Sequence, residues 1–373
     1  MKKNFLIFIF TTIVVIFVIE FFLVFFYPQN LDGWMKTRDK TGLDVLRKNS
    51  YFYHRDFGRN IKYKFGKYHN RKTSELNKVN KILLLGDSFP FGWLVEDKYI
   101  YPQLLQNSLP NYEIINVSVP KWGVDSYTRY LENYCKSINP EKTIVMLNTD
   151  DFRRGYHNKL YQTEIKKLLN DNNFNYEEID NIFLLNYSQI REKFKLKSNN
   201  PKPLVEISKF HKVPFYKFLV KNSNLFYLFR QSIINIKNNQ FFFNQKNFSD
   251  KFSVPSRSLP NDYKIANVYG KILMITLKEI ADNCGTELNI IYSGWYDYKN
   301  LPNLFNPTIY FLSEAENFFK IQNINYYDLT DKMKIMHKNP KEYIIKYDNH
   351  PNELGHEIIG NNLTELLKKQ ILK

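Results

Sequence analysis

The chain of 373 residues contains little cysteine, little alanine and comparatively few acidic residues. Two cysteines, Cys135 and Cys284, are too few for the disulfide framework that holds small secreted domains together. No group of cysteines and histidines has the spacing of a zinc site, so we expect no metal, and no motif indicates a cofactor. Only three alanines, beside many Lys, Asn, Ile, Phe and Tyr residues, indicate a bias in the coding DNA.

The shortage of acidic residues leaves a formal net charge of +16, which invites comparison with nucleic-acid-binding proteins. Residues 152–265 hold 20 Lys and Arg against 9 Asp and Glu, so +11 of the excess lies in one segment. That segment has no zinc finger, basic zipper or RNA-binding aromatic motif, and we expect no nucleic acid partner. Hydrophobic residues make up 43% and charged residues 24%, which predicts one large globular domain or two small ones.

One long apolar run, Phe5–Tyr27, lies near the N-terminus and contains a single charge, Glu20. As a helix this run extends about 34 Å, enough to cross the roughly 30 Å hydrocarbon core of a bilayer. A cleaved signal peptide is the rival interpretation. Its apolar region is shorter and ends in small residues, which Phe25–Pro28 does not supply. We therefore predict an uncleaved, single-pass membrane anchor over residues 1–28.

The orientation of this anchor is less clear from the sequence. Lys2 and Lys3 before the run favour an N-terminus inside the cell, with the rest of the chain exported to the periplasm or cell surface. Basic residues soon after the run, at positions 36, 38 and 40, weaken that argument. Glu20 is protonated, directed to the membrane interface or paired with a partner helix, and the sequence leaves these alternatives open.

Beyond residue 80, short apolar runs alternate with amphipathic segments. The runs predict buried strands at residues 81–85, 113–117, 143–147, 288–292 and 324–329. Apolar side chains at helical spacing predict helices at 98–109, 128–138, 273–280 and 313–321, and a last helix from about residue 353. Strands separated by helices predict an α/β fold, in which helices cover both faces of a parallel sheet and ligands bind at the carboxyl ends of the strands.

Two segments do not fit this alternation. Residues 29–80 are polar and aromatic, and we expect a membrane-proximal stalk or flap. Residues 152–265 form a predicted helical insertion between the third and fourth strands of the domain at 81–373. The aromatic, basic stretch 215–239 has helical character, and it either covers the site, lies at the membrane interface or packs on the core.

Residues able to do chemistry gather at two places, of which the first is Gly86–Pro90, with the sequence Gly-Asp-Ser-Phe-Pro. Ser88 follows the first predicted strand and precedes a helix. At such a turn a hydroxyl is exposed, and nearby backbone N–H groups can bind a developing oxyanion. An ordinary turn with serine as a helix cap gives the same pattern, so this motif alone is a weak signal.

The second place is Asp348–His356, directly before the last predicted helix. A serine hydroxyl is a poor nucleophile until a base takes its proton, and His350 is the candidate base. Asp348 lies two residues earlier, on the same side of an extended chain, where its carboxylate can hold the imidazole ring and stabilise the charged form. His356 falls within the last helix, and we interpret it as structural.

Four segments in order resemble the SGNH hydrolases, also called the GDSL esterase/lipase superfamily, in a membrane-anchored bacterial form. They are Gly86–Asp97 for the first block, Asn116–Gly123 for the second, Asn148–Asp151 for the third and Asp348–His356 for the last. The resemblance covers roughly residues 81–151 and 286–373. It implies a flavodoxin-like, three-layer α/β/α domain with a five-stranded parallel sheet, which hydrolyses or transfers an acyl ester.

The family pattern also implies roles for individual residues. Ser88 would be the nucleophile, His350 the base and Asp348 the residue that orients the base. The spacing departs from the family here, because the aspartate stands two residues before the histidine and three is commoner.

The residues implied for the oxyanion hole depart further from the pattern. The oxyanion would be held by the Ser88 N–H, a backbone N–H of the second block and an Asn side chain of the third. Lys121 stands where glycine is usual, with Gly123 two residues later, and Asp150 takes the Asn position, close to Asn148. An ionised carboxylate repels an oxyanion. We therefore expect Asp150→Asn to raise activity, unless Asp150 pairs with a basic residue of the insertion.

The expected function is that of a membrane-anchored serine esterase or O-acyltransferase acting on acyl esters of cell-envelope glycans or lipids. One alternative is a catalytically impaired relative that binds glycan or acyl chains at the membrane surface. Another is a lipid-surface protein whose basic, aromatic insertion lies on anionic headgroups. An α/β-hydrolase is the nearest rival fold, but its Gly-x-Ser-x-Gly turn requires glycine where this chain has Pro90.

Overall fold

A computed structural model describes residues 2–31, 34–73, 78–148, 150–158, 160–171, 218–219, 222–237, 260–294, 311–312 and 314–372. Most of the predicted insertion, including residues 172–217 and 238–259, lies outside the described residues, as do positions 149 and 313.

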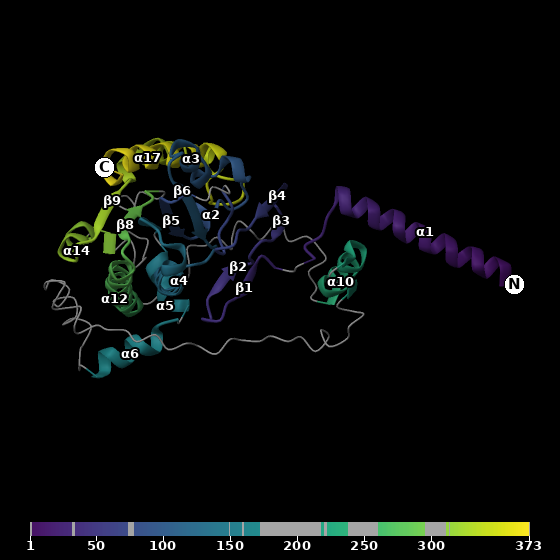
Figure 1. The fold of residues 1–373 in the computed structure, drawn as a ribbon, viewed down its shortest axis with the longest axis horizontal. Coiled ribbons are helices and arrows are strands. Elements are labelled where there is room, and N and C mark those ends of the chain that lie inside the picture. Colours follow the sequence, from purple (N-terminus) through teal and green to yellow (C-terminus); the bar gives the residue numbers. More distant parts are fainter. Residues whose placement is uncertain are drawn as a thin grey trace.

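Five parallel strands form the central sheet, in the order β6-β5-β7-β8-β9 (Figure 1). They are β5 (Lys81–Gly86), β6 (Glu113–Ser118), β7 (Lys142–Leu147), β8 (Glu287–Tyr292) and β9 (Asn325–Asp328). Each strand matches its predicted range to within one residue at either end. The strand order is that of flavodoxin-like sheets, so the predicted α/β fold with a five-stranded parallel sheet is confirmed.

Helices cover both faces of this sheet, as the side chains of β5 illustrate. Leu83 and Leu85 join an apolar cluster with α4 (Val124–Ile138) and α12 (Pro260–Cys284). Their neighbours Ile82 and Leu84 join a second cluster with α3 (Tyr101–Ser108) and α17 (Glu353–Leu366). Successive side chains of a strand point to opposite faces, so an unbroken apolar run requires helices on both sides.

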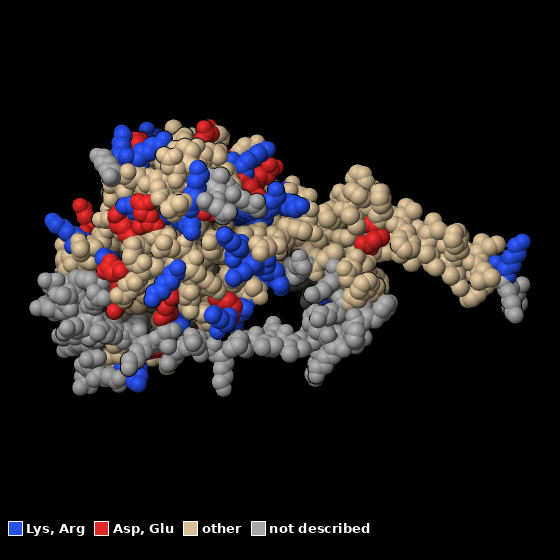
Figure 2. All heavy atoms as spheres, in the orientation of Figure 1, with Lys and Arg blue, Asp and Glu red and all other residues tan. Residues whose placement is uncertain are grey.

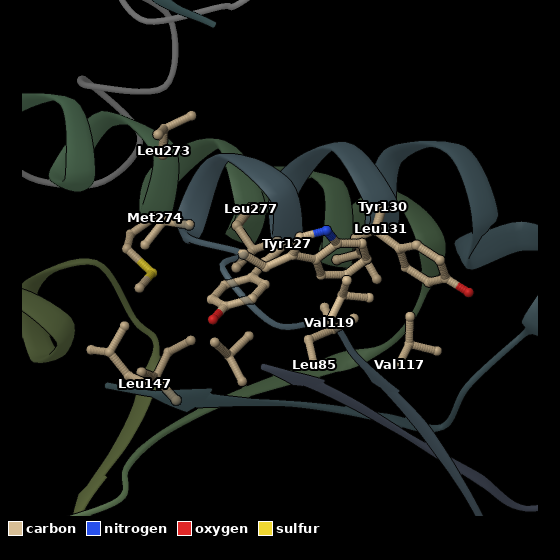
Figure 3. Close-up of a cluster of buried hydrophobic side chains, with 14 of the residues drawn as sticks. Leu85, Val117, Val119, Tyr127, Tyr130, Leu131, Leu147, Leu273, Met274 and Leu277 are labelled. Atoms are coloured by element: carbon tan, nitrogen blue, oxygen red, sulfur yellow. The ribbon is translucent and has the colours of Figure 1, made fainter. Parts of the chain in front are cut away.

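The first cluster forms the larger part of the core. In Figure 3, Tyr127 and Leu131 of α4 and Leu277 of α12 lie over Leu85 and the neighbouring strands. The remaining elements of the α/β domain are short. They are α14 (Ala315–Ile321), α15 (Lys334–Lys338), α16 (Pro340–Tyr343), the 3-10 helices Asp97–Tyr99 and Thr330–Met333, and the terminal π-helical turn Leu367–Ile371.

Residues 34–73 are part of the segment 29–80, for which we expected a membrane-proximal stalk or flap, and they are folded onto the α/β domain. Strand β1 (Lys36–Arg38) pairs with β2 (Asp44–Leu46), and β3 (Tyr51–Asp56) pairs with β4 (Arg59–Lys64), both antiparallel. Apolar side chains of both hairpins belong to the same core cluster as α4 and α12. This segment therefore contributes to the core directly beside the sheet.

The N-terminal helix α1 (Lys2–Phe26) projects from this domain, and almost all of its described side chains are exposed (Figure 1). Its segment Lys3–Phe26 is long and apolar enough to cross a membrane, and no other helix in the described part of the chain is. A membrane anchor and a signal sequence both have these properties. In Figure 2, the surface of α1 carries almost no charged side chains along most of its length.

Cys135 in the last turn of α4 and Cys284 at the end of α12 form a disulfide. The two cysteines are 149 residues apart in the chain, and α4 and α12 contact each other along the same face of the sheet. A disulfide framework was excluded from the cysteine count. A single bridge between packed helices was not foreseen, because only the fold brings these two residues together.

Three further helices of the insertion are described. They are α5 (Asp151–Asn158), α6 (Gln162–Asp171) and α10 (Asn224–Lys237). Helix α5 packs against α4 and α12, whereas α10 contacts α1. The insertion thus begins on the α/β domain and reaches the N-terminal helix.

Candidate active site

Ser88 is the first residue of the short helix α2 (Ser88–Phe91), which begins directly after β5. The Asp87 side chain caps this helix by accepting a hydrogen bond from the Phe89 N–H at 2.9 Å. A side chain at Gly86 would place its Cβ only 2.2 Å from Pro90 Cγ, so glycine is required at the end of the strand. This sharp turn presents Ser88 at the carboxyl edge of the sheet.

His350 lies on the other side of Ser88, with its Nε2 atom 2.8 Å from Ser88 Oγ. Asp348 Oδ1 accepts a hydrogen bond from the Nδ1 of His350 and another, at 2.9 Å, from the backbone N–H of the same residue. A carboxylate only accepts, so Nδ1 carries the hydrogen and the lone pair of Nε2 faces the serine hydroxyl. The structure thus brings together Ser88, His350 and Asp348 from opposite ends of the chain.

The environment of Asp348 keeps its carboxyl group ionised. Burial by itself would raise the pKa of Asp348, but the hydrogen bonds and charge of His350 hold it below the usual value. The rings of Phe89 and Trp93 lie 5.2 and 6.0 Å from the imidazole ring, so the histidine has apolar neighbours as well. An ionised carboxylate in this place fixes the tautomer of His350 and stabilises its protonated form.

A buried arginine holds the loop that follows α2. Arg71 donates to the carbonyl oxygens of Phe91, Gly92 and Val95 at 2.5 to 2.6 Å and pairs with Asp97 at 2.8 Å. Its side chain has no solvent exposure. Sequence reasoning missed Arg71, because it lies outside the four family blocks and a lone arginine in a polar segment carries no signal.

A second histidine, His54 of β3, also lies beside the site, with its ring centroid 4.2 Å from that of Trp93. The Tyr63 hydroxyl accepts a hydrogen bond from the Leu94 N–H at 2.8 Å, and it is also hydrogen-bonded to His54 Nδ1 at 2.8 Å. Burial lowers the pKa of His54 to about 4, so the ring is neutral at physiological pH. His54 was not predicted, because a half-polar hairpin gives no motif.

Asn148, the first of the residues expected near the oxyanion, directly follows β7, the neighbour of β5 in the sheet. Its Nδ2 donates to Asp87 Oδ2 at 3.3 Å, and its backbone N–H donates to Asp151 Oδ2 at 2.8 Å. Because Asp87 directly precedes Ser88 in the chain, this hydrogen bond holds the Asn148 amide beside the nucleophile candidate.

Asp150 is bound differently. Its carboxylate pairs with Arg153 at 2.8 Å and lies 3.6 Å from Arg154. Arg154 also donates to Asp87 at 2.5 Å. Although burial opposes it, the carboxylates of Asp87, Asp151 and Asp150 raise the pKa of Arg154 above its usual value. Asp150 is thus paired with basic residues of the insertion, which is the alternative to a position facing the oxyanion.

Gly123 caps the N-terminus of α4 with an extended backbone, at φ −136°. A Cβ at this position would lie 2.5 Å from the Asp151 carbonyl oxygen, so Gly123 permits the close approach of α5. The left-handed conformation that favours glycine occurs at Lys121 instead, at φ +72°. Lys121 therefore adopts a backbone conformation that favours glycine.

The hairpin β1–β2 supports this second loop. Lys36 donates to the Pro120 carbonyl oxygen at 2.5 Å, and Trp122 Nε1 donates to the Asp44 carbonyl oxygen at 2.7 Å. Burial lowers the pKa of Lys36 to about 8, with Lys121 and Arg154 acting in the same direction and Asp44 against it.

His356 lies within α17, as expected, and is fully buried. Its Nδ1 accepts a hydrogen bond from the Tyr101 N–H at 3.3 Å. Burial, followed by the charges of Arg71 and His350, lowers the pKa of His356 to about 3. A neutral ring packed against α3 is the arrangement of a structural histidine.

No protein-family model and no curated protein matches the sequence. Among solved structures, the psychrotrophic esterase EstA from Pseudoalteromonas sp. is 11% identical, with a TM-score of 0.41 over 79% of this chain and 100% of that one. A lipolytic protein of the G-D-S-L family from Veillonella parvula is 10% identical, with a TM-score of 0.40 over 78% of this chain and 100% of that one. The chain is similar in fold to one structure described as an esterase and to one described as a lipolytic protein of the G-D-S-L family.

A third similar structure is the acetyl-xylooligosaccharide esterase Axe2 from Geobacillus, which is 11% identical, with a TM-score of 0.41 over 80% of this chain and 99% of that one. At 10 to 11% identity the similarity concerns the fold alone.

Proposed function

We propose that this protein is a membrane-anchored serine esterase or O-acyltransferase of the SGNH type. The observation that supports this most strongly is the hydrogen-bonded series from Ser88 Oγ through His350 to Asp348, at the carboxyl edge of a parallel sheet. The correct tautomer of His350 is fixed by an ionised carboxylate, and this arrangement is what a serine needs to become a nucleophile.

In the first half of the reaction, Ser88 Oγ attacks the carbonyl carbon of the ester as His350 Nε2 takes the hydroxyl proton. The carbonyl electron pair moves to its oxygen, which gives a tetrahedral oxyanion. When the carbonyl re-forms, the bond to the alcohol breaks, and the leaving alkoxide takes the proton from His350. In the second half, water or a sugar hydroxyl attacks the acylated Ser88 by the same steps in reverse order.

The geometry supports two candidate donors for the oxyanion. As the first residue of α2, Ser88 has a backbone N–H that the helix itself does not use. The Asn148 amide lies beside Asp87 at the end of the adjacent strand. We propose these two groups as donors, with the loop of Pro120–Gly123 beside them. Asp150, which is paired with Arg153, is then a structural residue.

Two features support a location of the catalytic domain outside the cytoplasm. α1 is apolar enough to span a membrane, and the Cys135–Cys284 disulfide is of a kind that persists in oxidising compartments. We therefore propose that α1 remains as an anchor and that the catalytic domain is exported. An exported enzyme anchored in the membrane lies next to the acyl esters of envelope glycans and lipids, which we propose as its substrates.

Labelling of the full-length protein with a fluorophosphonate tests the proposed chemistry, because this reagent reacts with activated serines. Ser88→Ala is expected to abolish labelling. Ser137→Ala, which removes an exposed serine on α4, is the matched control and is expected to label like the natural protein. Failure of the natural protein to label would instead support the catalytically impaired, ligand-binding alternative.

A further inference from the structure

Glu20 is the only charged residue in the apolar run of α1. It lies six residues before Phe26, or about 9 Å along the helix axis. A carboxylate at this depth in a bilayer needs polar partners, because hydrocarbon supplies none. The sequence left open whether protonation, the interface or a partner helix accommodates it.

The structure provides these partners at the N-terminus of α10. Glu20 Oε1 accepts hydrogen bonds from the backbone N–H and side-chain amide of Asn224, at 2.6 and 3.1 Å. Glu20 Oε2 accepts from the Ser223 hydroxyl and the Leu225 N–H, both at 2.9 Å. All four donors come from a segment more than 200 residues away in the chain, and together they surround one carboxylate.

These hydrogen bonds satisfy both the Glu20 carboxylate and the first N–H groups of α10. The first N–H groups of a helix have no partner within the helix, and a bilayer interior holds no water that might replace one. The positive end of the helix dipole also favours an anion. A second hydrogen bond joins α10 to the chain just after α1, because the Gln29 N–H donates to Asn224 Oδ1 at 2.7 Å.

The helices α1 and α10 also lie against each other. Leu23, one turn after Glu20, is the only buried apolar side chain among the described residues of α1, and α10 is the helix that contacts α1. In Figure 1, α10 lies beside the end of α1 that leads into the rest of the molecule. Phe229 and Ile233, four residues apart on one face of α10, are 62% and 49% exposed.

We propose that α10 is a second membrane-seated helix, with its exposed face at Phe229 and Ile233 covered by lipid acyl chains. A helix N-terminus that is bonded to Glu20 lies at the same depth in the membrane as Glu20. With 14 residues, or about 21 Å, α10 is too short to cross the bilayer, so it is embedded in the leaflet next to the catalytic domain. The inference rests on the proposed anchor and is independent of the ester chemistry.

The decisive experiment measures the depth of single labels in the full-length protein. Phe229→Cys, Phe17→Cys and Asn317→Cys are each labelled with an environment-sensitive fluorophore. The natural cysteines form a disulfide, so only the introduced thiol reacts. The proteins are placed in vesicles of phosphatidylethanolamine and phosphatidylglycerol that contain lipid spin-labelled on its acyl chain. Asn317 is the control, because it is exposed on α14, at the opposite end of the molecule from α1 (Figure 1).

The proposal predicts strong quenching at Phe229 and at Phe17 and none at Asn317. Quenching at Phe17 alone would overturn the inference and leave the anchor intact. Absence of quenching at Phe17 would overturn the anchor and this inference together, and neither result bears on the reactivity of Ser88.

A second experiment tests the role of Glu20. Glu20→Leu keeps α1 apolar but removes both acceptor oxygens. It is expected to accelerate hydrogen exchange of the first amides of α10 and to reduce quenching at position 229. Thr12→Leu is the matched control, because the Thr12 hydroxyl donates only within α1, to the Phe8 carbonyl oxygen. Unchanged exchange and quenching in Glu20→Leu would show that the carboxylate does not hold α10.

Discussion

At the scale of single residues, Ser88 and His350 are expected to act as one unit. Ser88→Ala and His350→Ala should each lower kcat for a simple ester by about four to six orders of magnitude, and the double variant should lose no more, because the two residues serve the same step. His356→Ala should retain turnover if the variant folds, since this ring is buried against α3. The base is misassigned if His356→Ala is inactive while His350→Ala still turns over.

The third block gives a sharper comparison. Asn148→Ala should reduce kcat about 100- to 1000-fold, the usual effect of losing one oxyanion donor. Asp150→Asn should change kcat little, because the carboxylate that it replaces is paired with Arg153. Steady-state kinetics on one ester measures both variants. A gain in Asp150→Asn with an unaffected Asn148→Ala would place Asp150 at the oxyanion.

The buried carboxyl of Asp125 makes stability depend on pH. Burial raises the pKa of Asp125 to about 7, against the hydrogen bonds from Asn158 and Ser126. Unfolded chains lose this proton above about pH 4, whereas the folded protein keeps it until about pH 7, so the natural protein loses stability across this interval. Asp125→Asn removes the ionisation. Relative to the natural protein it should therefore gain up to about 4 kcal/mol between pH 4 and pH 8.

Urea unfolding of the detergent-solubilised chain at both pH values measures this difference. Asp331→Asn, at an exposed aspartate, is the control and should show no such trend. A pH-independent difference between Asp125→Asn and the natural protein would mean that Asp125 titrates normally.

At the scale of elements, the hairpins at residues 34–73 are expected to hold the active-site loop through Arg71. Arg71→Met removes the hydrogen bonds that Arg71 donates to three carbonyl groups and the ion pair with Asp97, so it should lower the free energy of unfolding by about 3 kcal/mol or more. Arg59→Met removes a half-exposed pair with Glu353 and should cost about 1 kcal/mol or less. Equal losses in the two variants, measured by urea unfolding, would contradict this account of the loop.

The strands of the central sheet could be predicted from the sequence, whereas the hairpins at residues 34–73 could not. The five strands were predictable, because a strand buried on both faces is an unbroken apolar run, as at Lys81–Gly86. The hairpins were not, since strands such as Arg59–Lys64 mix buried apolar with exposed charged residues. Ser88, His350 and Asp348 were predicted from their places beside a predicted strand and the last predicted helix, and from the family blocks. His54 and Arg71 belong to no block, and the partners of Glu20 lie more than 200 residues away, where no local pattern relates them.

At the scale of the whole molecule, the disulfide and α1 predict where the protein works. In intact cells, Cys135 and Cys284 should be oxidised and resist alkylation until a reductant is added, because bridges of this kind persist outside the cytoplasm. Gel-shift alkylation of the natural protein measures this, with a cytoplasmic protein of the same cells as the reduced control. Free thiols in freshly quenched cells would contradict export of the domain.

Deletion of residues 1–28 should release the protein from membranes on alkaline extraction. α1 is the only described helix that is both long enough and apolar enough to span a bilayer, and α10 is too short to hold the protein integrally. The full-length protein should remain in the membrane pellet under the same conditions. Retention of the truncated protein after alkali would mean that another segment anchors it.

The central claim is that Ser88 is the residue that carries the acyl group. Acid quenching of the full-length protein during turnover of an activated ester, followed by mass spectrometry of its peptides, tests this claim directly. The account predicts an acyl mass on the peptide that contains Ser88, absent in Ser88→Ala and in His350→Ala. Turnover by the natural protein with no acyl group on Ser88, or with one on another residue, would contradict it.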